Sequence, residues 1–543
     1  MKKLLLLFLL LLPLPSSLFP LPSYLLPSHA QRHNDNGMGD VDVEMLRKLQ
    51  IAQLAITQLY VDSVDQNKLV EDAINGILEK LDPHSAYSNA EDTKKLNEPL
   101  EGNFEGVGIS YNILEDTVIV VSTISKGPCE KVGILAGDRI VSVDDSIIAG
   151  KGITRDTVLK ILRGPKDTKV NLGVLRPGNK DLIYFNVKRD KIPVNTLGAA
   201  YMIAPRIGYI QLDRFGATSG DEVKEAIKTL KKEGMEALIF DLENNGGGYL
   251  GAASEIASQF LKKGDLVVYT EGRAAPKQVF RAEGGGLFTE GPLVILVNES
   301  SASAAEIVSG AIQDNDRGTI IGRRTFGKGL VQRPIDLPDG SMIRLTVSHY
   351  YTPSGRCIQK PYEKGKKEEY SQDLNNRYNH GELTCIDSIH LDSTKVYRTL
   401  RRERIVYGGG GVMPDVFVPL DTTHYTKFYQ ALRRLNLFNS VTLRYIDHER
   451  KTLKKTYKRF DDFLTDYEVP QTLIDEVIAE AEKKDARPKD DDELQETLPD
   501  IRFILKALIA YDIWDRNEYF RIINTRSDSV KKALEFLQQS LSK

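Results

Sequence analysis

The chain has 543 residues, of which 41% are hydrophobic and 27% charged, so it is too long for one hydrophobic core and predicts three or four domains. Its formal net charge of −3 gives no electrostatic basis for binding nucleic acid. Cys129, Cys357 and Cys385 are too widely spaced for a metal cluster or a disulfide framework, and we expect no metal and no cofactor. A Cys357–Cys385 bridge and three free thiols both remain open.

The first thirty residues form a pattern typical of a secretory signal peptide. Lys2 and Lys3 precede an apolar run at residues 4–12, which is too short to span a bilayer, and small residues at Ser28 and Ala30 suit a signal peptidase. We therefore expect residues 1–30 to be a signal peptide cleaved near Ala30, and the protein to be exported to a periplasmic or other extracytoplasmic space. If the leader is not cleaved, it would associate the protein with a membrane surface.

Residues 41–100 predict an N-terminal helical region. Apolar residues recur at intervals of three and four between positions 43 and 81, which indicates two or three amphipathic helices with a turn around residues 61–65. The sequence Leu81-Asp-Pro-His-Ser85 ends the last helix, because a residue before proline avoids helical geometry. We interpret His84 as a turn residue.

Residues 104–194 predict a separate β-rich module, in which short β-forming runs alternate with Gly, Pro and Asp turns around one helix. This module resembles a PDZ domain in three successive segments, at residues 106–109, 133–140 and 159–165. A glycine loop of this kind directs backbone N–H groups at the terminal carboxylate of a peptide, which then adds as a strand to the sheet. We expect protein or peptide substrates with accessible C-termini to bind at Gly106, Val107, Gly108 and Ile109.

Residues 195–420 alternate between β and α patterns, which predicts an α/β domain with its ligand site at the carboxyl ends of the strands. Within it, the charged and tyrosine-rich residues 362–379 are expected to be a solvated excursion. Residues 421–543 are helical and long enough for a bundle of their own. This tail could form a homodimer or dock on its own core, and the sequence leaves both open.

Three segments of the α/β domain carry candidate chemistry. The glycine-rich turn at residues 241–248 can present N–H groups to a substrate oxygen, and it lacks the lysine-serine ending of a nucleotide-binding loop. The segment from Ser300 to Glu306 places three serines at a strand-to-helix junction, where capping explains at most one of them. Lys328, between two glycines, is either an exposed turn residue or a desolvated base that takes the proton of a serine.

Together these segments resemble the C-terminal processing peptidases, also called tail-specific proteases. The resemblance covers roughly residues 43–420 and rests on the elements Ser-Ala-Ser-Ala-x-Glu and Thr-Phe-Gly-Lys-Gly, whose serine and lysine are twenty-five residues apart. It implies a multidomain α/β fold: an α/β peptidase core with an inserted PDZ domain, N-terminal helices and a C-terminal helical domain. It also implies roles for individual residues: Ser303 as nucleophile, Lys328 as general base, Gln332 orienting the lysine, Asp314 catalytic in some members, and Gly247 and Ala304 as oxyanion donors.

The chain departs from the family pattern at three positions. Glu243 stands where arginine is usual, Gly246 where proline is frequent, and Cys357 where serine is common. The change at Gly246 leaves N–H donors in place, whereas Glu243 reverses the local charge. His349 is a rival base, which the serine-lysine match makes a strand residue instead.

The predicted function is that of an exported serine endopeptidase that recognises substrate C-termini through its PDZ domain and cleaves by acyl transfer through a Ser-Lys dyad. The alternative is a catalytically inactive PDZ scaffold that binds protein C-termini. Intact Ser303 and Lys328 favour the enzyme.

Overall fold

The computed structural model describes residues 43–422 and 425–542, so the predicted signal peptide and its cleavage at Ala30 lie outside the described residues. The chain divides into two units, Met1–Val64 and Asp65–Lys543. In the first unit the structure describes an amphipathic helix, α1 (Val43–Leu59). None of the helices in the described ranges is both long enough and apolar enough to cross a membrane.

The second unit begins with a helix, α2 (Gln66–Leu78), as the hydrophobic periodicity predicts. The Asp65 carboxylate caps α2 by accepting the backbone N–H groups of Asn67 and Lys68. The elements β1 (Ala86–Ser88), α3 (Ala90–Glu101) and β2 (Asn103–Gly106) follow. Strand β2 pairs with β9 (Asp190–Pro193), so two antiparallel strands lead into and out of the β-rich module.

The β-rich module contains a six-stranded antiparallel sheet in the order β3-β4-β5-β7-β8, with β6 beside β5. Its elements are β3 (Ile109–Leu114), β4 (Thr117–Thr123), α4 (Pro128–Val132), β5 (Arg139–Val143), β6 (Ser146–Ile147), α5 (Arg155–Leu162), β7 (Lys169–Leu175) and β8 (Ile183–Lys188). The module has its own hydrophobic core. Strand β3 lies at one edge of the sheet, where a peptide strand can add.

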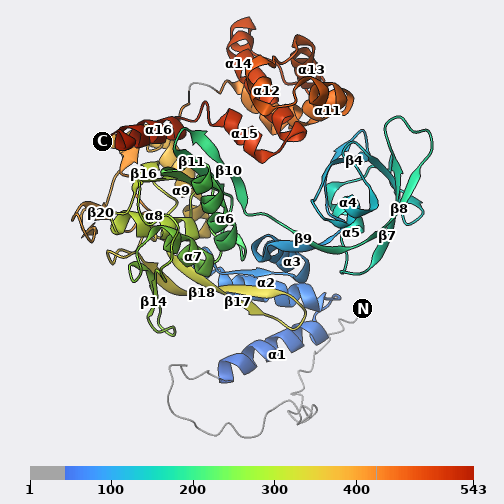
Figure 1. Ribbon diagram of the computed structural model, residues 1–543. Helices are drawn as coiled ribbons and strands as arrows, with labels where there is room; N and C mark the ends of the chain where they lie inside the picture. The colour runs from blue at the N-terminus through green and yellow to red at the C-terminus, as the bar shows by residue number, and fades with distance from the viewer. Residues whose placement is uncertain (1–42, 423–424, 543) are drawn as a thin grey trace, which may run out of the picture. The chain divides into compact units, whose positions relative to one another are not determined.

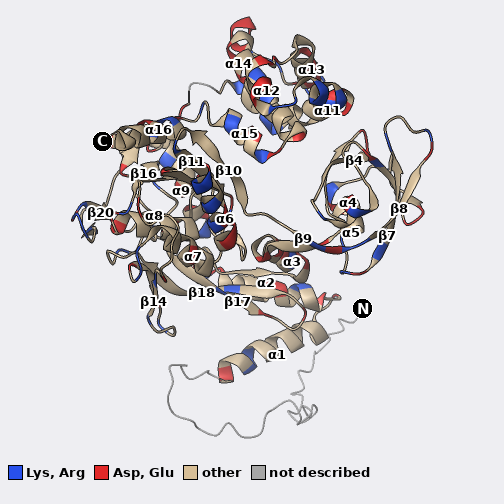
Figure 2. Ribbon diagram, viewed as in Figure 1, with Lys and Arg blue, Asp and Glu red and all other residues tan. Residues whose placement is uncertain are grey.

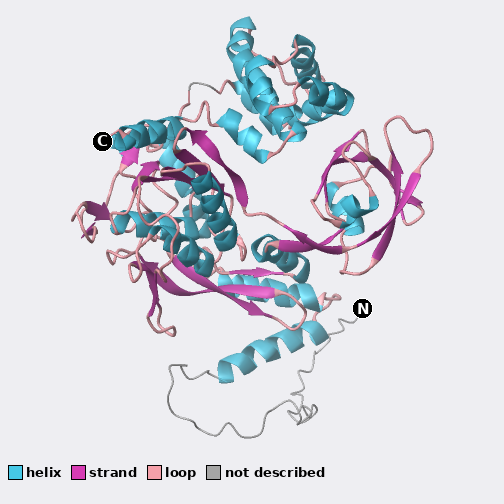
Figure 3. Cartoon of the chain, viewed as in Figure 1, coloured by secondary structure: helices cyan, strands magenta, loops and turns pink. Residues whose placement is uncertain are grey.

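The centre of the α/β domain is a six-stranded sheet in the order β10-β11-β12-β15-β16-β21. Its strands are β10 (Leu197–Ala204), β11 (Ile207–Leu212), β12 (Ala237–Asp241), β15 (Leu293–Val297), β16 (Thr319–Gly322) and β21 (Val416–Phe417). All neighbours are parallel except β10 and β11. Figures 1 and 3 show the strands and helices of this domain. Strands β11, β12 and β15 are buried along their whole length, which explains their nearly continuous apolar sequences.

Helices cover both faces of this sheet. On one face, α6 (Ser219–Lys232), α7 (Leu250–Phe260) and α8 (Ala304–Asp314) contribute to the main core. On the other, α16 (Asp528–Leu541) packs Val530, Ala533 and Leu537 against the strands. The last helix of the predicted C-terminal domain therefore completes the α/β core and seals a sheet face that would otherwise expose apolar side chains.

A second, antiparallel sheet flanks the first and follows the order β1-β18-β13-β14, with β17 paired to β18. Its further strands are β13 (Leu266–Glu271), β14 (Gln278–Arg281), β17 (Leu330–Asp336) and β18 (Met342–Tyr351). Strand β17 begins two residues after Lys328, so this sheet supports the lysine segment. The chain then forms α9 (Lys367–Asn379), a 3-10 turn at Ile386–Ser388, and the hairpin β19 (Val396–Arg398) and β20 (Ile405–Tyr407).

The C-terminal helices α10 to α15 surround a separate hydrophobic core. They are α10 (Lys427–Arg434), α11 (Leu437–Thr456), α12 (Phe460–Asp466), α13 (Gln471–Glu482), α14 (Asp491–Ile513) and α15 (Arg516–Ile523). Basic and acidic residues occur along these helices, the α/β domain and the β-rich module alike (Figure 2). The architecture confirms the predicted multidomain α/β fold class.

Candidate active site

The three predicted chemical segments follow three neighbouring parallel strands. The glycine turn follows β12, the serine segment follows β15, and the lysine segment follows β16. Because parallel strands end at the same edge of a sheet, the segments meet there. The sequence prediction that they converge is therefore confirmed by the topology.

Ser303 occupies the junction between β15 and α8 in a strained backbone conformation, with φ 57° and ψ −114°. A positive φ at a residue with a Cβ is uncommon and is found mainly where the surrounding structure enforces it, frequently at functional sites. Ser303 remains partly exposed, although α8 behind it is buried throughout. The strained junction thus presents a serine at the surface of a rigid element.

Hydrogen bonds tie the serine segment to the glycine turn. Ser301 Oγ donates to the Leu242 carbonyl at 2.7 Å, and Asn298 and Asn244 exchange two hydrogen bonds of 3.0 and 3.1 Å. Ser301 is buried and has a structural role, whereas Ser303 is partly exposed.

Glu306 joins the serine segment to the lysine segment. One carboxylate oxygen accepts the backbone N–H groups of Ser303 and Lys328 at 2.9 and 2.8 Å, and the other accepts the Thr325 hydroxyl at 2.5 Å and the Gly327 N–H at 2.8 Å. Burial raises the pKa of Glu306, and these four donors oppose that rise. The sequence placed Glu306 in the serine motif without giving it a role.

A buried tyrosine makes a second link between the two segments. The Tyr350 hydroxyl lies 3.0 Å from the carbonyl oxygen of Ser303 and 2.5 Å from that of Lys328. Tyr350 lies on β18, and its side chain is almost completely buried. Tyr350 therefore holds the carbonyl groups of the same two residues whose N–H groups Glu306 accepts.

The amine of Lys328 is held by the side chain that the family resemblance assigns to it. Lys328 Nζ donates to Gln332 Oε1 at 2.9 Å, and Gln332 Nε2 donates to the His84 carbonyl at 2.6 Å. Among the described residues, no hydrogen bond joins Lys328 Nζ to Ser303 Oγ in this structure. Catalytic hydrogen bonds often tighten only when substrate binds, and a direct contact with the serine would require the amine to leave Gln332 or to share that contact.

The surroundings of Lys328 favour its neutral form. Burial is the largest cause that lowers its pKa, and the charge of Arg344 on β18 adds to it. The carboxylates of Glu306 and Asp82 act in the opposite direction but do not reverse the shift. A lysine with a lowered pKa can accept a proton nearer neutral pH than a solvated one.

His84 lies in a turn, as predicted, but it also belongs to the lysine environment. Burial, followed by the charge of Lys328, lowers the pKa of His84 to about 4, so its ring is neutral at physiological pH. Its Nε2 lies 2.9 Å from the Tyr370 hydroxyl. Nothing in the sequence indicated these contacts, because position 84 lies far along the chain from Gln332 and Tyr370.

The predicted oxyanion donors are adjacent in space. A Cβ placed on Gly247 would lie 2.9 Å from the Ala304 nitrogen and 2.8 Å from Ser303 Cβ, so only glycine fits there. Ala304 is the first residue of α8, whose N–H has no partner one turn earlier within the helix. The Gly247 N–H, however, donates to Asn245 Oδ1 at 2.8 Å in this structure. The assignment of both donors stays a prediction.

Asp314 is not brought together with Ser303 and Lys328. It is the last residue of α8, and the helix of 11 residues places it about 16 Å from Ser303. Its carboxylate forms a fully buried ion pair with Arg356 at 2.8 Å and accepts the Ser354 N–H at 3.0 Å. These contacts give Asp314 a structural place instead of the catalytic one that the resemblance suggested.

The remaining expectations concern His349 and the cysteines. His349 lies on β18, opposite Leu330 of β17, as the strand interpretation predicted. Cys129, Cys357 and Cys385 are all free thiols, so no Cys357–Cys385 bridge is present. Across residues 43–422 and 425–542, no group of three or more His, Cys, Asp and Glu side chains is arranged to hold a metal ion.

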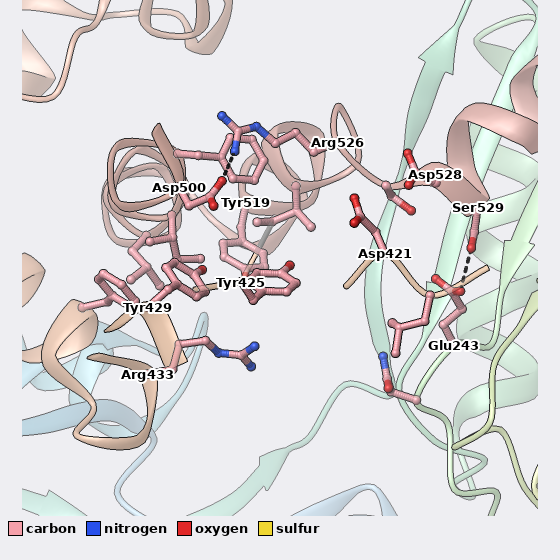
Figure 4. Close-up of a pocket in the computed structure, with 18 of the residues that line it drawn as sticks. Glu243, Asp421, Tyr425, Tyr429, Arg433, Asp500, Tyr519, Arg526, Asp528 and Ser529 are labelled. Atoms are coloured by element: carbon pink, nitrogen blue, oxygen red, sulfur yellow. Dashed lines mark hydrogen bonds and ion pairs between the residues drawn. The ribbon is translucent and has the colours of Figure 1, made fainter. Parts of the chain in front are cut away.

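Glu243 belongs to the glycine-rich turn and lines a cavity of about 750 Å³ between the strand ends of the core and the C-terminal helices. Its carboxyl oxygen accepts the Ser529 hydroxyl of α16 at 2.9 Å (Figure 4). Burial and the neighbouring carboxylate of Asp241 raise the pKa of Glu243 to about 8. Glu243, which stands where the family pattern has arginine, is therefore largely neutral at pH 7. It contacts α16 through Ser529.

The predicted peptide-binding residues span the end of β2, a two-residue turn and the first residue of β3. Gly108 has φ 77°, and a Cβ there would lie 3.0 Å from Ile192 Cδ1 and 3.1 Å from Pro128 Cδ, so the turn requires glycine. Val107 is buried in the core of the module, and its carbonyl accepts the Cys129 N–H at 3.0 Å. The loop is thus rigid and leads directly into edge strand β3 at Ile109.

Comparison with known proteins accounts for most of the chain. Residues 206–366 match Peptidase family S41, residues 106–189 a PDZ domain, and residues 25–92 the N-terminal domain of the activating protease CtpB. Residues 428–515 match a family of unknown function.

Curated relatives agree with these matches. The carboxy-terminal-processing protease of Bartonella bacilliformis is 39% identical over 305 residues, which are 55% of this chain and 69% of that protein. The carboxy-terminal processing protease CtpA of Bacillus subtilis is 36% identical over 330 residues, 60% of this chain and 69% of that protein. With the strand-end serine and lysine segments and the PDZ module in place, the chain belongs to the carboxy-terminal processing proteases of peptidase family S41.

Proposed function

We propose that this protease is a serine endopeptidase in which Ser303 is the nucleophile and Lys328 the general base. One observation carries the proposal: Glu306 and Tyr350 hold the backbones of both residues, while burial lowers the pKa of the lysine amine. A serine hydroxyl needs an adjacent base to become an effective nucleophile, and a desolvated amine can serve.

The reaction would proceed by acyl transfer. Neutral Lys328 takes the proton of Ser303 Oγ as the oxygen attacks a peptide carbonyl, and the resulting ammonium then protonates the leaving amine. The Ala304 N–H at the start of α8 stabilises the oxyanion. The Gly247 N–H joins it after release from Asn245 Oδ1, and water later hydrolyses the acyl-enzyme.

Replacing the two residues tests the dyad. Ser303→Ala and Lys328→Ala should each abolish cleavage of a substrate with a free C-terminus, whereas His349→Ala should retain it, because His349 is a strand residue. Loss of activity in His349→Ala with retention in Lys328→Ala would contradict the dyad. A wild-type chain that binds C-terminal peptides but never reacts with a fluorophosphonate would favour the inactive scaffold.

We propose that the PDZ module recruits substrates by their C-termini at residues 106–109, with the peptide adding beside β3. Gly108→Ala should raise KM for a peptide with a free C-terminal carboxylate, because the new Cβ clashes with Ile192 and Pro128. Gly178→Ala is the matched control, since Gly178 also has a positive φ but no atom within 4 Å of the added Cβ. An unchanged KM in Gly108→Ala would contradict recruitment at this loop.

The leader sequence supports the further proposal that the protease is exported. N-terminal sequencing of the protein isolated from its source should find a mature chain that begins near Gln31. A mature chain that retains Met1 in the cytoplasmic fraction would contradict export.

A further inference from the structure

The segment after the S41 match contains a mostly exposed helix with two buried residues that contact the surroundings of Lys328. The family match ends at residue 366, and α9 begins at Lys367. The sequence predicted a solvated excursion at residues 362–379, and most of α9 is indeed exposed. Two of its residues, Tyr370 and Arg377, are nevertheless buried, and both contact the segment that carries Lys328 or its supports.

Arg377 holds the chain just before the catalytic lysine. Its guanidinium donates to the carbonyl oxygens of Arg324 at 2.7 Å and Thr325 at 3.1 Å. Its orientation is fixed by Glu382, which accepts from Arg377 Nε at 2.8 Å and forms a bidentate pair with Arg324 at 2.6 and 2.7 Å. A planar guanidinium that binds two successive carbonyls fixes the local backbone more tightly than a single contact.

Tyr370 reaches the lysine amine from another direction. Its hydroxyl lies 2.9 Å from His84 Nε2, the His84 carbonyl accepts Gln332 Nε2, and Gln332 Oε1 accepts Lys328 Nζ. Gln359 adds a parallel path, because its amide contacts the Tyr370 hydroxyl at 3.3 Å and accepts the Gly329 N–H at 2.8 Å.

Lys360 lies between the aromatic rings of Phe326 and Tyr370 and links α9 to the lysine segment. Its Nζ lies 4.0 Å from the Phe326 ring centroid, 4.1 Å from that of Tyr370, and 2.8 Å from Asp373 of α9. Cation–π contacts of this kind strengthen when the cation is desolvated, and Lys360 is buried. Phe326 precedes Lys328 by two residues, so the cluster also covers the lysine segment.

We propose that α9 is a clamp that positions Lys328 for catalysis, with Tyr370 and Arg377 as its positioning residues. This inference rests on the proposed function, in which Lys328 is the general base. The two buried residues of α9 contact either the chain just before Lys328 or His84, which binds Gln332. The buried face of the helix therefore packs against the candidate active site. Loosening the clamp would admit water to Lys328 and reduce the burial that lowers its pKa.

Tyr370→Phe is the sharpest test, because it keeps the ring and removes only the hydroxyl. We expect kcat to fall about five- to tenfold near neutral pH with KM within about twofold, since one positioning hydrogen bond is lost. The ascending limb of the pH–rate profile should move to higher pH. The charged and titratable groups that face Lys328 are Arg344, Glu306, Asp82 and His84, and all four remain in this variant.

Tyr378→Phe is the matched control, because Tyr378 lies on the same helix and is 52% exposed. It should leave kcat and the pH profile unchanged. A folded Tyr370→Phe variant with wild-type kcat and pH profile would overturn the clamp, as would an equal loss in Tyr378→Phe. Turnover by Lys328→Ala would instead overturn the proposed dyad, so the two failures are distinguishable.

Discussion

The two ends of α8 show two ways to bury a carboxylate. Glu306 in the first turn accepts three backbone N–H groups and one hydroxyl, and within the described part of the chain no cationic side chain forms an ion pair with it. Asp314 at the last residue is paired with the guanidinium of Arg356, and both side chains are fully buried. One acid therefore organises backbone donors, whereas the other neutralises a buried charge.

The different partners of Glu306 and Asp314 predict different effects of mutation, on the reaction for Glu306 and on stability for Asp314. The donors of Glu306 belong to Ser303, Lys328 and two further residues of the lysine segment, Thr325 and Gly327, so its position sets the geometry of the site. Asp314 ties α8 to the loop around Arg356, about 16 Å from Ser303. Disturbing Glu306 should affect the reaction, and disturbing Asp314 should affect the free energy of unfolding.

The largest expected effect is that of Asp314→Asn on stability. Removing one partner of a buried ion pair leaves Arg356 without its counter-charge, which costs about 3–5 kcal/mol of unfolding free energy. The folded fraction should keep the wild-type kcat. Urea unfolding gives the first quantity, and turnover normalised by active-site titration gives the second. A loss of kcat larger than tenfold with unchanged stability would show that Asp314 acts in the reaction and not in stability.

Glu306→Gln should show the opposite pattern. An amide has one acceptor oxygen in place of two, so buried N–H donors of the site lose a partner and the backbones of Ser303 and Lys328 shift. We expect kcat to fall about a hundredfold, as misplaced catalytic groups typically do, with a stability loss of about 1–3 kcal/mol. Steady-state kinetics and urea unfolding measure both. Unchanged kcat would show that Glu306 is structural, like Asp314.

Glu243 extends the comparison to a third buried acid, whose effect is spread over several pH units and is therefore the smallest at any one pH step. Burial raises its pKa from 4.5 to about 8, so the folded state holds a proton that the unfolded state releases between these pH values. Stability should therefore fall as pH rises from about 4.5 to about 8, by no more than about 1.4 kcal/mol per pH unit.

Glu243→Gln tests this dependence, because its neutral amide cannot titrate. Urea unfolding at several pH values should show a smaller decline for the variant than for the wild type. Identical pH dependence in both proteins would mean that Glu243 does not hold the proton.

The sequence predicted the parts of the fold that depend on local pattern. The apolar runs that form β11, β12 and β15 were recognisable, and so were the three segments that follow parallel strands. Strand ends meet at one edge by topology, which made their convergence predictable. The choice of Ser303 among neighbouring serines required the family resemblance, because composition and spacing alone left the alternatives open.

The contacts around Lys328 were not predictable from local pattern. His84, Tyr350 and Tyr370 are distant from Lys328 in sequence or lie on elements whose packing was unknown. Most of residues 362–379 are exposed, but the burial of Arg377 was not predictable, because it depends on pairing the guanidinium with Glu382 and two carbonyls. Buried charges depend on such partners, which sequence does not reveal.

The central claim is that Lys328 deprotonates Ser303. The rate at which a fluorophosphonate labels Ser303, measured across pH in the wild type and in Lys328→Ala, tests it most directly. The wild-type rate should rise with pH along a limb whose midpoint lies below the ordinary lysine value of 10.5, since burial lowers the pKa of Lys328. Lys328→Ala should lack this limb and label about 10²- to 10⁴-fold more slowly. Equal labelling rates and identical pH profiles in the two proteins would contradict the account.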